Sequence, residues 1–217
     1  MNTVISGLYA AESEPLGFGP SLGIRAYLLQ REGGNLLIYR SATLEQDVET
    51  VNDLGGISRQ YLNHHHEASP ACDWVANTFG APLHVHEEDA AAAAEICNVD
   101  ATFSERHKLD GDFEVIPIPG HTGGATAFLW DSGQHRVLFT GDTIFFGRSK
   151  WRAAVLDGIS DRDRYIESLE LIRTLDFDLL VPGIAPAGRP YYSFTDRAEA
   201  TQQIDEILER VRRGESG

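Results

Sequence analysis

Four short apolar segments in this chain each run into a turn that is rich in glycine or polar residues, and this pattern constrains the fold most. The four turns, in chain order, are Asn63-His64-His65-His66-Glu67-Ala68-Ser69, Pro119-Gly120-His121-Thr122-Gly123-Gly124, Phe139-Thr140-Gly141-Asp142-Thr143 and Val181-Pro182-Gly183-Ile184. Short apolar runs bounded by such turns are typical of buried strands. We therefore expect a protein built on strands, with its polar motifs at the strand ends.

Strand and helix patterns alternate along the rest of the chain. We expect strands at 4–8, 24–30, 35–40, the run into His64, 82–86, 113–117, 125–131, 136–140 and 178–181. Helices are expected after a capping box at Thr43 and Gln46, after the Ser69-Pro70 pair, around 89–97, around 165–172 and around 200–211. Two groups of strands, each followed by helices, indicate two packed sheets with helices on the outside.

The histidine cluster of the first turn has the spacing of a metal-binding motif. In an extended segment, residues i and i+2 lie on one side, so His64 and His66 can point at one ion while His65 points away. A second possible pair at the same spacing is His65 with Glu67. His84 and His86 also alternate, but they match no ligand motif, and we interpret them as surface or core residues.

Taken together, the four motifs resemble the metallo-β-lactamase superfamily. The resemblance covers nearly the whole chain, and the second and third motifs look most like its glyoxalase II and persulfide dioxygenase branches. It implies an α/β fold of the four-layer αββα type, formed by a single domain over residues 1–217 with two similar halves, roughly 1–110 and 111–217.

The resemblance also implies a set of metal ligands. In the superfamily, the two histidines of the first motif and the histidine of the second bind the first metal, so His64, His66 and His121 are expected to do so here. Asp142 matches the bridging ligand between the two metals, and we expect it to bind the metal and to act in catalysis.

The second metal site of the superfamily is incomplete in this chain. The first motif usually reads His-x-His-x-Asp-His, but here Ala68 replaces the aspartate and Ser69 replaces the histidine. Ile184 stands where the fourth motif usually carries a histidine. Arg40 also stands in a segment, Tyr39-Arg40-Ser41, where relatives usually have an aspartate that supports the ligands. We therefore predict a mononuclear site with altered support around its ligands.

Three neutral imidazoles and one carboxylate fit a single divalent metal. Zinc suits this ligand set best, and iron or manganese also accepts it. Arg152, Tyr191 and Tyr192 follow the third and fourth motifs and are candidates for the mouth of the site, whereas His107 and His135 are interpreted as loop residues.

Composition limits the class of protein. The 217 residues suit one domain, and a formal net charge of -15 argues against nucleic-acid partners. The two cysteines, Cys72 and Cys97, are too few for a disulfide framework. No signal peptide or membrane-length apolar run is visible, so we expect cytoplasmic residence and no membrane partner. A homo-oligomer is possible, although no feature of the sequence indicates one.

The leading functional prediction is a metal-dependent hydrolase that uses one metal-bound water on a small ester, thioester, lactone or similar substrate. A mononuclear iron oxidoreductase of the persulfide dioxygenase type is the first alternative. The second is a binding protein whose site has lost catalysis, because three of the seven superfamily ligands are absent.

Overall fold

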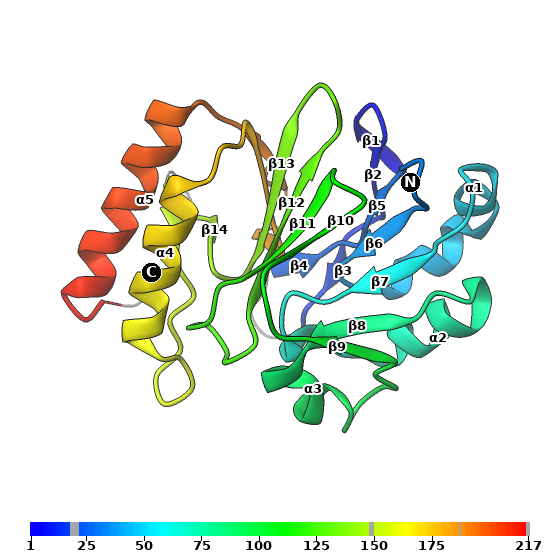
Figure 1. Ribbon diagram of the computed structural model, residues 1–217, viewed down its shortest axis with the longest axis horizontal. Coiled ribbons are helices and arrows are strands. Elements are labelled where there is room, and N and C mark those ends of the chain that lie inside the picture. The colour runs from blue at the N-terminus through cyan, green and yellow to red at the C-terminus, as the bar shows by residue number, and fades with distance from the viewer. Residues whose placement is uncertain (18–21, 148–149, 187, 216–217) are drawn as a thin grey trace. The chain divides into compact units, whose positions relative to one another are not determined.

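The computed structural model of the chain describes residues 1–17, 22–147, 150–186 and 188–215, and these fall into two compact units, Met1–Ser104 and Glu105–Gly217 (Figure 1). The prediction that the whole chain forms one domain stays a prediction. No helix within the described ranges is long and apolar enough to cross a membrane.

The first unit is built on a mixed sheet with the strand order β1-β2-β5-β6-β7-β8-β9 in the part of the chain that the structure describes. Its strands are β1 (Asn2–Ile5), β2 (Leu8–Ala10), β5 (Tyr27–Leu29), β6 (Leu36–Ile38), β7 (Arg59–Tyr61), β8 (Leu83–His86) and β9 (Ala101–Phe103). The pairs from β6 to β9 are parallel and the earlier pairs are antiparallel. A separate antiparallel pair joins β3 (Glu14–Pro15) to β4 (Leu22–Ile24).

Helices of the first unit cover one face of this sheet. They are the 3₁₀ helix η1 (Ala42–Asp47), α1 (Val48–Asp53), α2 (Pro70–Phe79) and α3 (Glu87–Ala93), with a short 3₁₀ turn η2 (His65–Glu67) before α2. Leu28 and Leu37 of the sheet pack with Val51 of α1 and Val75 of α2. Leu83 and Val85 pack with the segment that follows the first motif and with α3. Burial of these alternate strand residues fixes the face that the helices cover.

The second unit contains a sheet with the order β10-β11-β12-β13-β16-β18 among its described residues. Its strands are β10 (His107–Leu109), β11 (Phe113–Pro117), β12 (Thr126–Asp131), β13 (Arg136–Gly141), β16 (Leu179–Pro182) and β18 (Ser193–Phe194). Among the described strands of this sheet, β13 and β16 are parallel neighbours and the other pairs are antiparallel. Two further strands, β14 (Phe145–Phe146) and β15 (Trp151–Arg152), form a hairpin, and β17 (Ile184–Pro186) follows the fourth motif.

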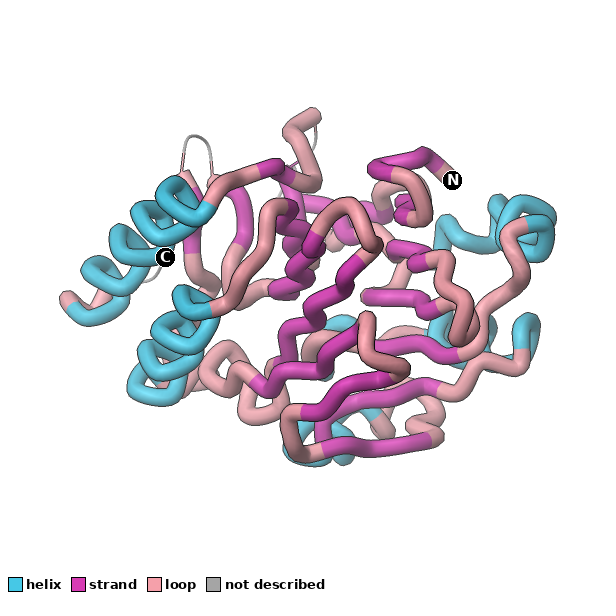
Figure 2. Tube along the Cα trace, turned by 45° about the horizontal axis from the view of Figure 1, so that its top comes forward, coloured by secondary structure: helices cyan, strands magenta, loops and turns pink. Residues whose placement is uncertain are grey.

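Two helices, α4 (Arg162–Thr174) and α5 (Arg197–Arg212), lie side by side over one face of the second sheet (Figures 1 and 2). Tyr165, Leu169 and Ile172 of α4 share an apolar core with Ile204 and Ile207 of α5. Strand residues from β11, β12, β13 and β16 complete that core: Ile116, Ala127, Leu129, Leu138 and Leu180. The helical periodicity predicted around 165–172 and 200–211 is therefore confirmed.

Several local predictions need correction. The cap of the first helical segment is Ser41, whose hydroxyl accepts a hydrogen bond from the Thr43 N–H, and not the predicted box at Thr43. The strand expected to run into His64 ends at Tyr61, and residues 65–67 form a 3₁₀ turn instead of extended chain. The Ser69-Pro70 start of α2 is confirmed, and the helix ends at Gly80, with φ of 69°.

Candidate metal-binding site

The first motif lies at the carboxyl ends of the parallel strands in the first unit. The chain leaves β7 at Tyr61, reaches His64 in an extended conformation (φ -159°, ψ 166°), and then makes the η2 turn. Because of this turn, the rings of His64 and His66 come to lie 5.1 Å apart between centroids, at an interplanar angle of 88°. His64 is buried and His66 is exposed. The two predicted ligands of this motif therefore lie together, through a turn and not through strand alternation.

A fixed tautomer prepares His64 for metal binding. Its Nδ1–H donates to the Asn63 Oδ1 at 2.9 Å, and the Glu67 Oε1 lies 3.6 Å from the same nitrogen. The other Glu67 oxygen, Oε2, accepts from the Asn63 main-chain N–H at 2.8 Å. With its Nδ1 proton held in this way, the imidazole presents the Nε2 lone pair for coordination.

His65 is not among the possible metal ligands, as predicted, and it contacts Asp89 instead. Its main-chain N–H donates to the Asp89 Oδ2 at 2.8 Å, and its Nδ1 lies 3.1 Å from that oxygen. The His65 ring packs against the His66 ring with a centroid distance of 4.3 Å. Partial burial, with a smaller contribution from the neighbouring His65, lowers the pKa of His66 and favours its neutral form.

In the second unit, His121 follows β11 in the Pro119-Gly120 turn and is almost fully buried. Its Nδ1–H donates to the Ala154 carbonyl oxygen at 2.7 Å, which leaves the Nε2 lone pair available for a ligand. The Ser160 hydroxyl donates to the His121 carbonyl at 3.0 Å, and the Asp161 N–H donates to the Gly120 carbonyl at 2.9 Å. The residues that lead into α4 thus hold the second motif in place.

Glycine is required in this turn because of a close approach by α4. Gly120 has φ of 140°, and a Cβ at this position would lie 2.4 Å from the Tyr165 Cα. The Tyr165 hydroxyl accepts from the Ala154 N–H at 3.1 Å and donates to the Thr143 carbonyl at 2.7 Å. Tyr165 therefore joins the second motif, the third motif and the segment that holds the His121 ring.

Asp142 follows β13 and reaches towards His121. Its Oδ2 lies 3.9 Å from the His121 Nε2, and burial raises the pKa of its carboxyl to about 7. The fourth motif packs closely against the third, since the Gly183 N–H donates to the Gly141 carbonyl at 2.9 Å. The second unit by itself therefore brings together one predicted imidazole ligand and the predicted carboxylate.

Comparison with known proteins agrees with this geometry. The sequence pattern described as the metallo-beta-lactamase superfamily matches residues 64–184, which include all four motifs. The chain belongs to the metallo-β-lactamase superfamily.

Among related sequences, the uncharacterized protein YmaE of Bacillus subtilis (strain 168) is 30% identical over 141 residues, which is 63% of this chain. The match spans only 50% of YmaE.

Solved structures share the metallo-β-lactamase fold. A metallo-beta-lactamase from Pontibacter korlensis has a TM-score of 0.73 at 16% identity, with 97% of each chain covered. ETHE1 from Myxococcus xanthus has a TM-score of 0.66 at 20% identity, covering 88% of this chain and 82% of that one. The predicted fold class is thereby confirmed.

Within this superfamily, the chain retains three histidines that can serve as metal ligands, His64 and His66 in the first unit and His121 in the second. The positions that differ from the superfamily pattern are occupied by residues with structural contacts. Ala68 is buried in an apolar cluster, the Ser69 hydroxyl accepts from the Ala71 N–H at 3.3 Å to cap α2, and Ile184 is buried. Arg40 forms an ion pair with Glu14.

His84 and His86 have structural partners, in agreement with their interpretation as surface or core residues. His107 begins β10, so its interpretation as a loop residue is wrong. His86 caps α3 by accepting from the Glu88 N–H at 3.2 Å, and His84 stacks on Tyr61 with ring centroids 4.9 Å apart. His107 lies close to the Glu105 carbonyl and His135 lies 3.1 Å from an Asp178 oxygen.

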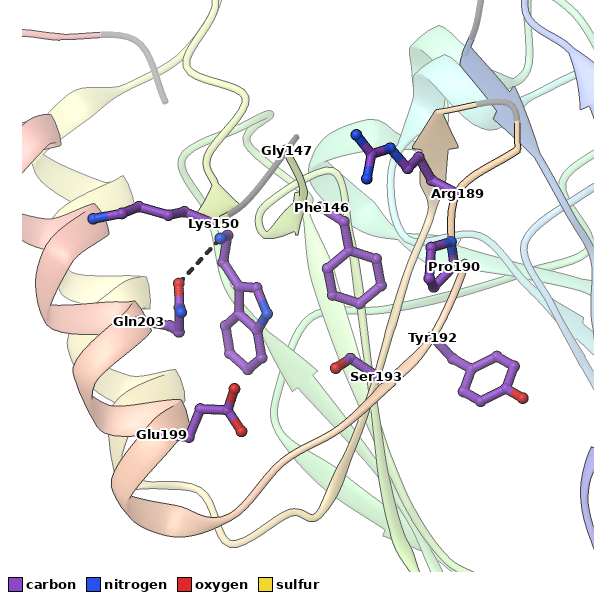
Figure 3. A pocket seen from close by; sticks show the side chains of 10 residues that line it. Phe146, Gly147, Lys150, Arg189, Pro190, Tyr192, Ser193, Glu199 and Gln203 are labelled. Atoms are coloured by element: carbon purple, nitrogen blue, oxygen red, sulfur yellow. Dashed lines mark hydrogen bonds between the residues drawn. The ribbon is translucent and has the colours of Figure 1, made fainter.

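The second unit also contains a pocket of about 280 Å³ beside the start of α5 (Figure 3). Its walls come from the β14–β15 hairpin, from the loop after β17 and from α5. The lining residues among those described are Phe146, Gly147, Lys150, Trp151, Arg189, Pro190, Tyr192, Ser193, Glu199 and Gln203. Of the three candidates for the mouth of the site, Tyr192 lines this pocket, whose walls contain none of the predicted metal ligands.

Proposed function

We propose that this chain is a mononuclear metal-dependent hydrolase of a small ester, thioester or lactone. The observation that supports the proposal is that two of the expected ligands have their rings fixed by hydrogen bonds. The Asn63 side chain orients His64, and the Ala154 carbonyl orients His121. Both histidines also lie in the part of the chain that matches the superfamily. The donors fit one ion, with His64, His66 and His121 as neutral ligands and Asp142 as the carboxylate.

When bound at such a site, a divalent ion lowers the pKa of its water to about 7 and so supplies hydroxide near neutral pH. The chain's own contribution at this position is the Asp142 carboxylate, which would complete the ligand set beside His121, with its Oδ2 3.9 Å from the His121 Nε2. We propose zinc as the metal and a small molecule as the substrate, and we place the protein in the cytoplasm.

Ala68, Ser69 and Ile184 support the proposal of a single ion. An alanine and an isoleucine offer no donor atom, and the Ser69 hydroxyl is engaged at the start of α2. A second ion would then depend on Asp142 and water, which is a weak ligand set for a divalent transition metal.

Metal analysis combined with turnover tests the proposal. Protein purified without added metal should contain about one zinc per chain, and it should cleave generic ester, thioester or lactone substrates. Both properties should be lost in His121→Ala and kept in His107→Ala, which changes an exposed histidine. Iron in place of zinc would favour the oxidoreductase alternative, and a folded chain without metal or turnover would reject catalysis.

A further inference from the structure

Asp89 is a buried carboxylate outside the predicted ligand set that contacts the first motif. It belongs to the first turn of α3 and is only 2% exposed. One of its oxygens, Oδ2, accepts the His65 main-chain N–H at 2.8 Å and lies 3.1 Å from the His65 Nδ1. A single carboxylate oxygen therefore contacts both the main chain and the ring of the residue between His64 and His66.

Sheet topology explains how Asp89 reaches this position. Strands β7 and β8 are parallel neighbours, so their carboxyl ends lie at the same edge of the sheet. The first motif follows β7, and α3 follows β8 directly, with His86 as its cap. The first turn of α3 is thus placed beside the η2 turn.

The η2 turn needs a hydrogen-bond acceptor from elsewhere. His64 stands at its cap position but makes no side-chain cap bond, because its Nδ1–H is directed to Asn63. The first N–H groups of any helical turn have no partner inside the turn, and leaving one buried without an acceptor costs stability. Asp89 supplies an acceptor for one of these groups, the N–H of His65, the first residue of the turn.

The contact between Asp89 and His65 also affects His66, because the rings of His65 and His66 pack together. The His65 ring, in contact with Asp89, packs on His66 with centroids 4.3 Å apart at 65°. His66 in turn lies 5.1 Å from His64. Glu67 makes a matching bond on the other side of His64, where its Oε2 accepts the Asn63 N–H.

We propose that Asp89 is a positioning residue for the metal: by holding the main chain and ring of His65, it keeps His64 and His66 in the arrangement in which both bind one ion. This inference rests on the proposed metal site. Groups that orient metal ligands typically contribute 10- to 100-fold to metal affinity.

Zinc affinity of folded variants, measured by competition with a chromophoric chelator, tests this role. Asp89→Ala should bind zinc about 10- to 100-fold more weakly than the wild type. Asp89→Asn, which keeps an acceptor oxygen, should recover most of that loss. A matched control is Asp100→Ala, because Asp100 also accepts a main-chain N–H in this unit, from Leu83 at 2.8 Å, but does so at the start of β8, away from the strand end where the first motif lies.

Thermal unfolding of the metal-free variants separates positioning from stability. We expect Asp100→Ala to lower the melting temperature and to keep wild-type zinc affinity. If Asp89→Ala and Asp89→Asn both bind zinc as tightly as Asp100→Ala, Asp89 has only a structural role and the inference is wrong. A wild-type chain that binds no zinc would instead reject the proposed metal site itself, and the two failures are thus distinguishable.

Discussion

Asp142 shows how one buried side chain sets a pH dependence. Its pKa is raised from 3.8 to about 7 by burial, so in the metal-free protein the folded state binds a proton more tightly than the unfolded chain. The associated stability is fully present below pH 4 and is lost as the pH rises through 7. At about 1.4 kcal/mol per pKa unit, this change in the free energy of unfolding is at most about 4 kcal/mol. It is smaller than that limit because 18% of the Asp142 side chain remains accessible to water.

We therefore expect Asp142→Asn to stabilise the metal-free protein at pH 8 relative to the wild type, and to have little effect near pH 4. Urea unfolding in the presence of a chelator at both pH values measures this difference. Asp157→Asn changes an exposed aspartate of the same unit and should show no such trend. A difference between Asp142→Asn and wild type that does not vary with pH would contradict the prediction.

Sequence alone predicts the residues that bind but not the residues that orient them. His64 and His121 stand in recognisable motifs, whereas the group that accepts the His121 Nδ1 proton is a main-chain carbonyl, at Ala154. A carbonyl is present at every residue and leaves no trace in the sequence. Asp89 is missed for a different reason, since it meets His65 only through the pairing of β7 with β8.

At the scale of elements, α4 is the support of the second and third motifs. The Tyr165 hydroxyl accepts from the Ala154 N–H and donates to the Thr143 carbonyl, and the Ser168 hydroxyl donates to the Pro119 carbonyl at 2.6 Å. These bonds connect the first turns of the helix to the segments on both sides of His121. A change in this helix should therefore alter the metal site as well as stability.

Tyr165→Phe tests that connection. Removing the hydroxyl leaves the Ala154 N–H and the Thr143 carbonyl without these bonds, at a cost of about 1 to 3 kcal/mol in unfolding free energy. Zinc affinity should also fall, because Ala154 holds the His121 ring. Tyr9→Phe, which removes an exposed bond to Gln30, should change neither quantity. Unchanged zinc affinity in a destabilised Tyr165→Phe protein would limit α4 to a structural role.

Ser69 marks the start of α2, at the position where the first superfamily motif usually has a histidine. Its hydroxyl caps α2 by accepting from the Ala71 N–H, so Ser69→Ala should cost about 1 kcal/mol, or roughly 2 to 4 °C in melting temperature. Zinc content should not change. Ser69→Thr keeps a capping hydroxyl and serves as the control. Lost zinc in Ser69→Ala would show that the hydroxyl belongs to the metal site.

The long helices and strands could be predicted because each is long enough for its buried side chains to show a regular repeat along the sequence. The apolar stripe of α5, with Ile204 and Ile207, and the run of β11 matched their observed bounds closely. Strands β14 and β18, of two residues each, were missed, since two residues show no periodicity. The η2 turn was missed because His-x-His spacing suits both a strand and a turn.

At the scale of the whole molecule, the differences from the superfamily pattern form one coherent change. Ala68 and Ser69 belong to the first unit and Ile184 to the second. By the resemblance to the superfamily, all three stand at positions where ligands of the second metal are expected. The residues that now stand there contribute to packing or capping. This agreement favours loss of one metal site as a unit over gradual decay of both, because decay of both would also have removed His64 or His121.

Restoring all three ligands tests this view. The combined change Ala68→Asp, Ser69→His and Ile184→His should raise bound zinc from about one towards about two ions per chain, as in two-metal sites. A second ion needs all of these donors together, so each single change should leave the zinc content near that of the wild type.

The matched control, Ala68→Asn with Ser69→Ala and Ile184→Ala, supplies no new carboxylate or imidazole. Elemental analysis gives the content, and unfolding measurements confirm that the triple variants fold despite the lost cap. An unchanged zinc content in a folded triple variant would mean that the second site was not lost through these three positions.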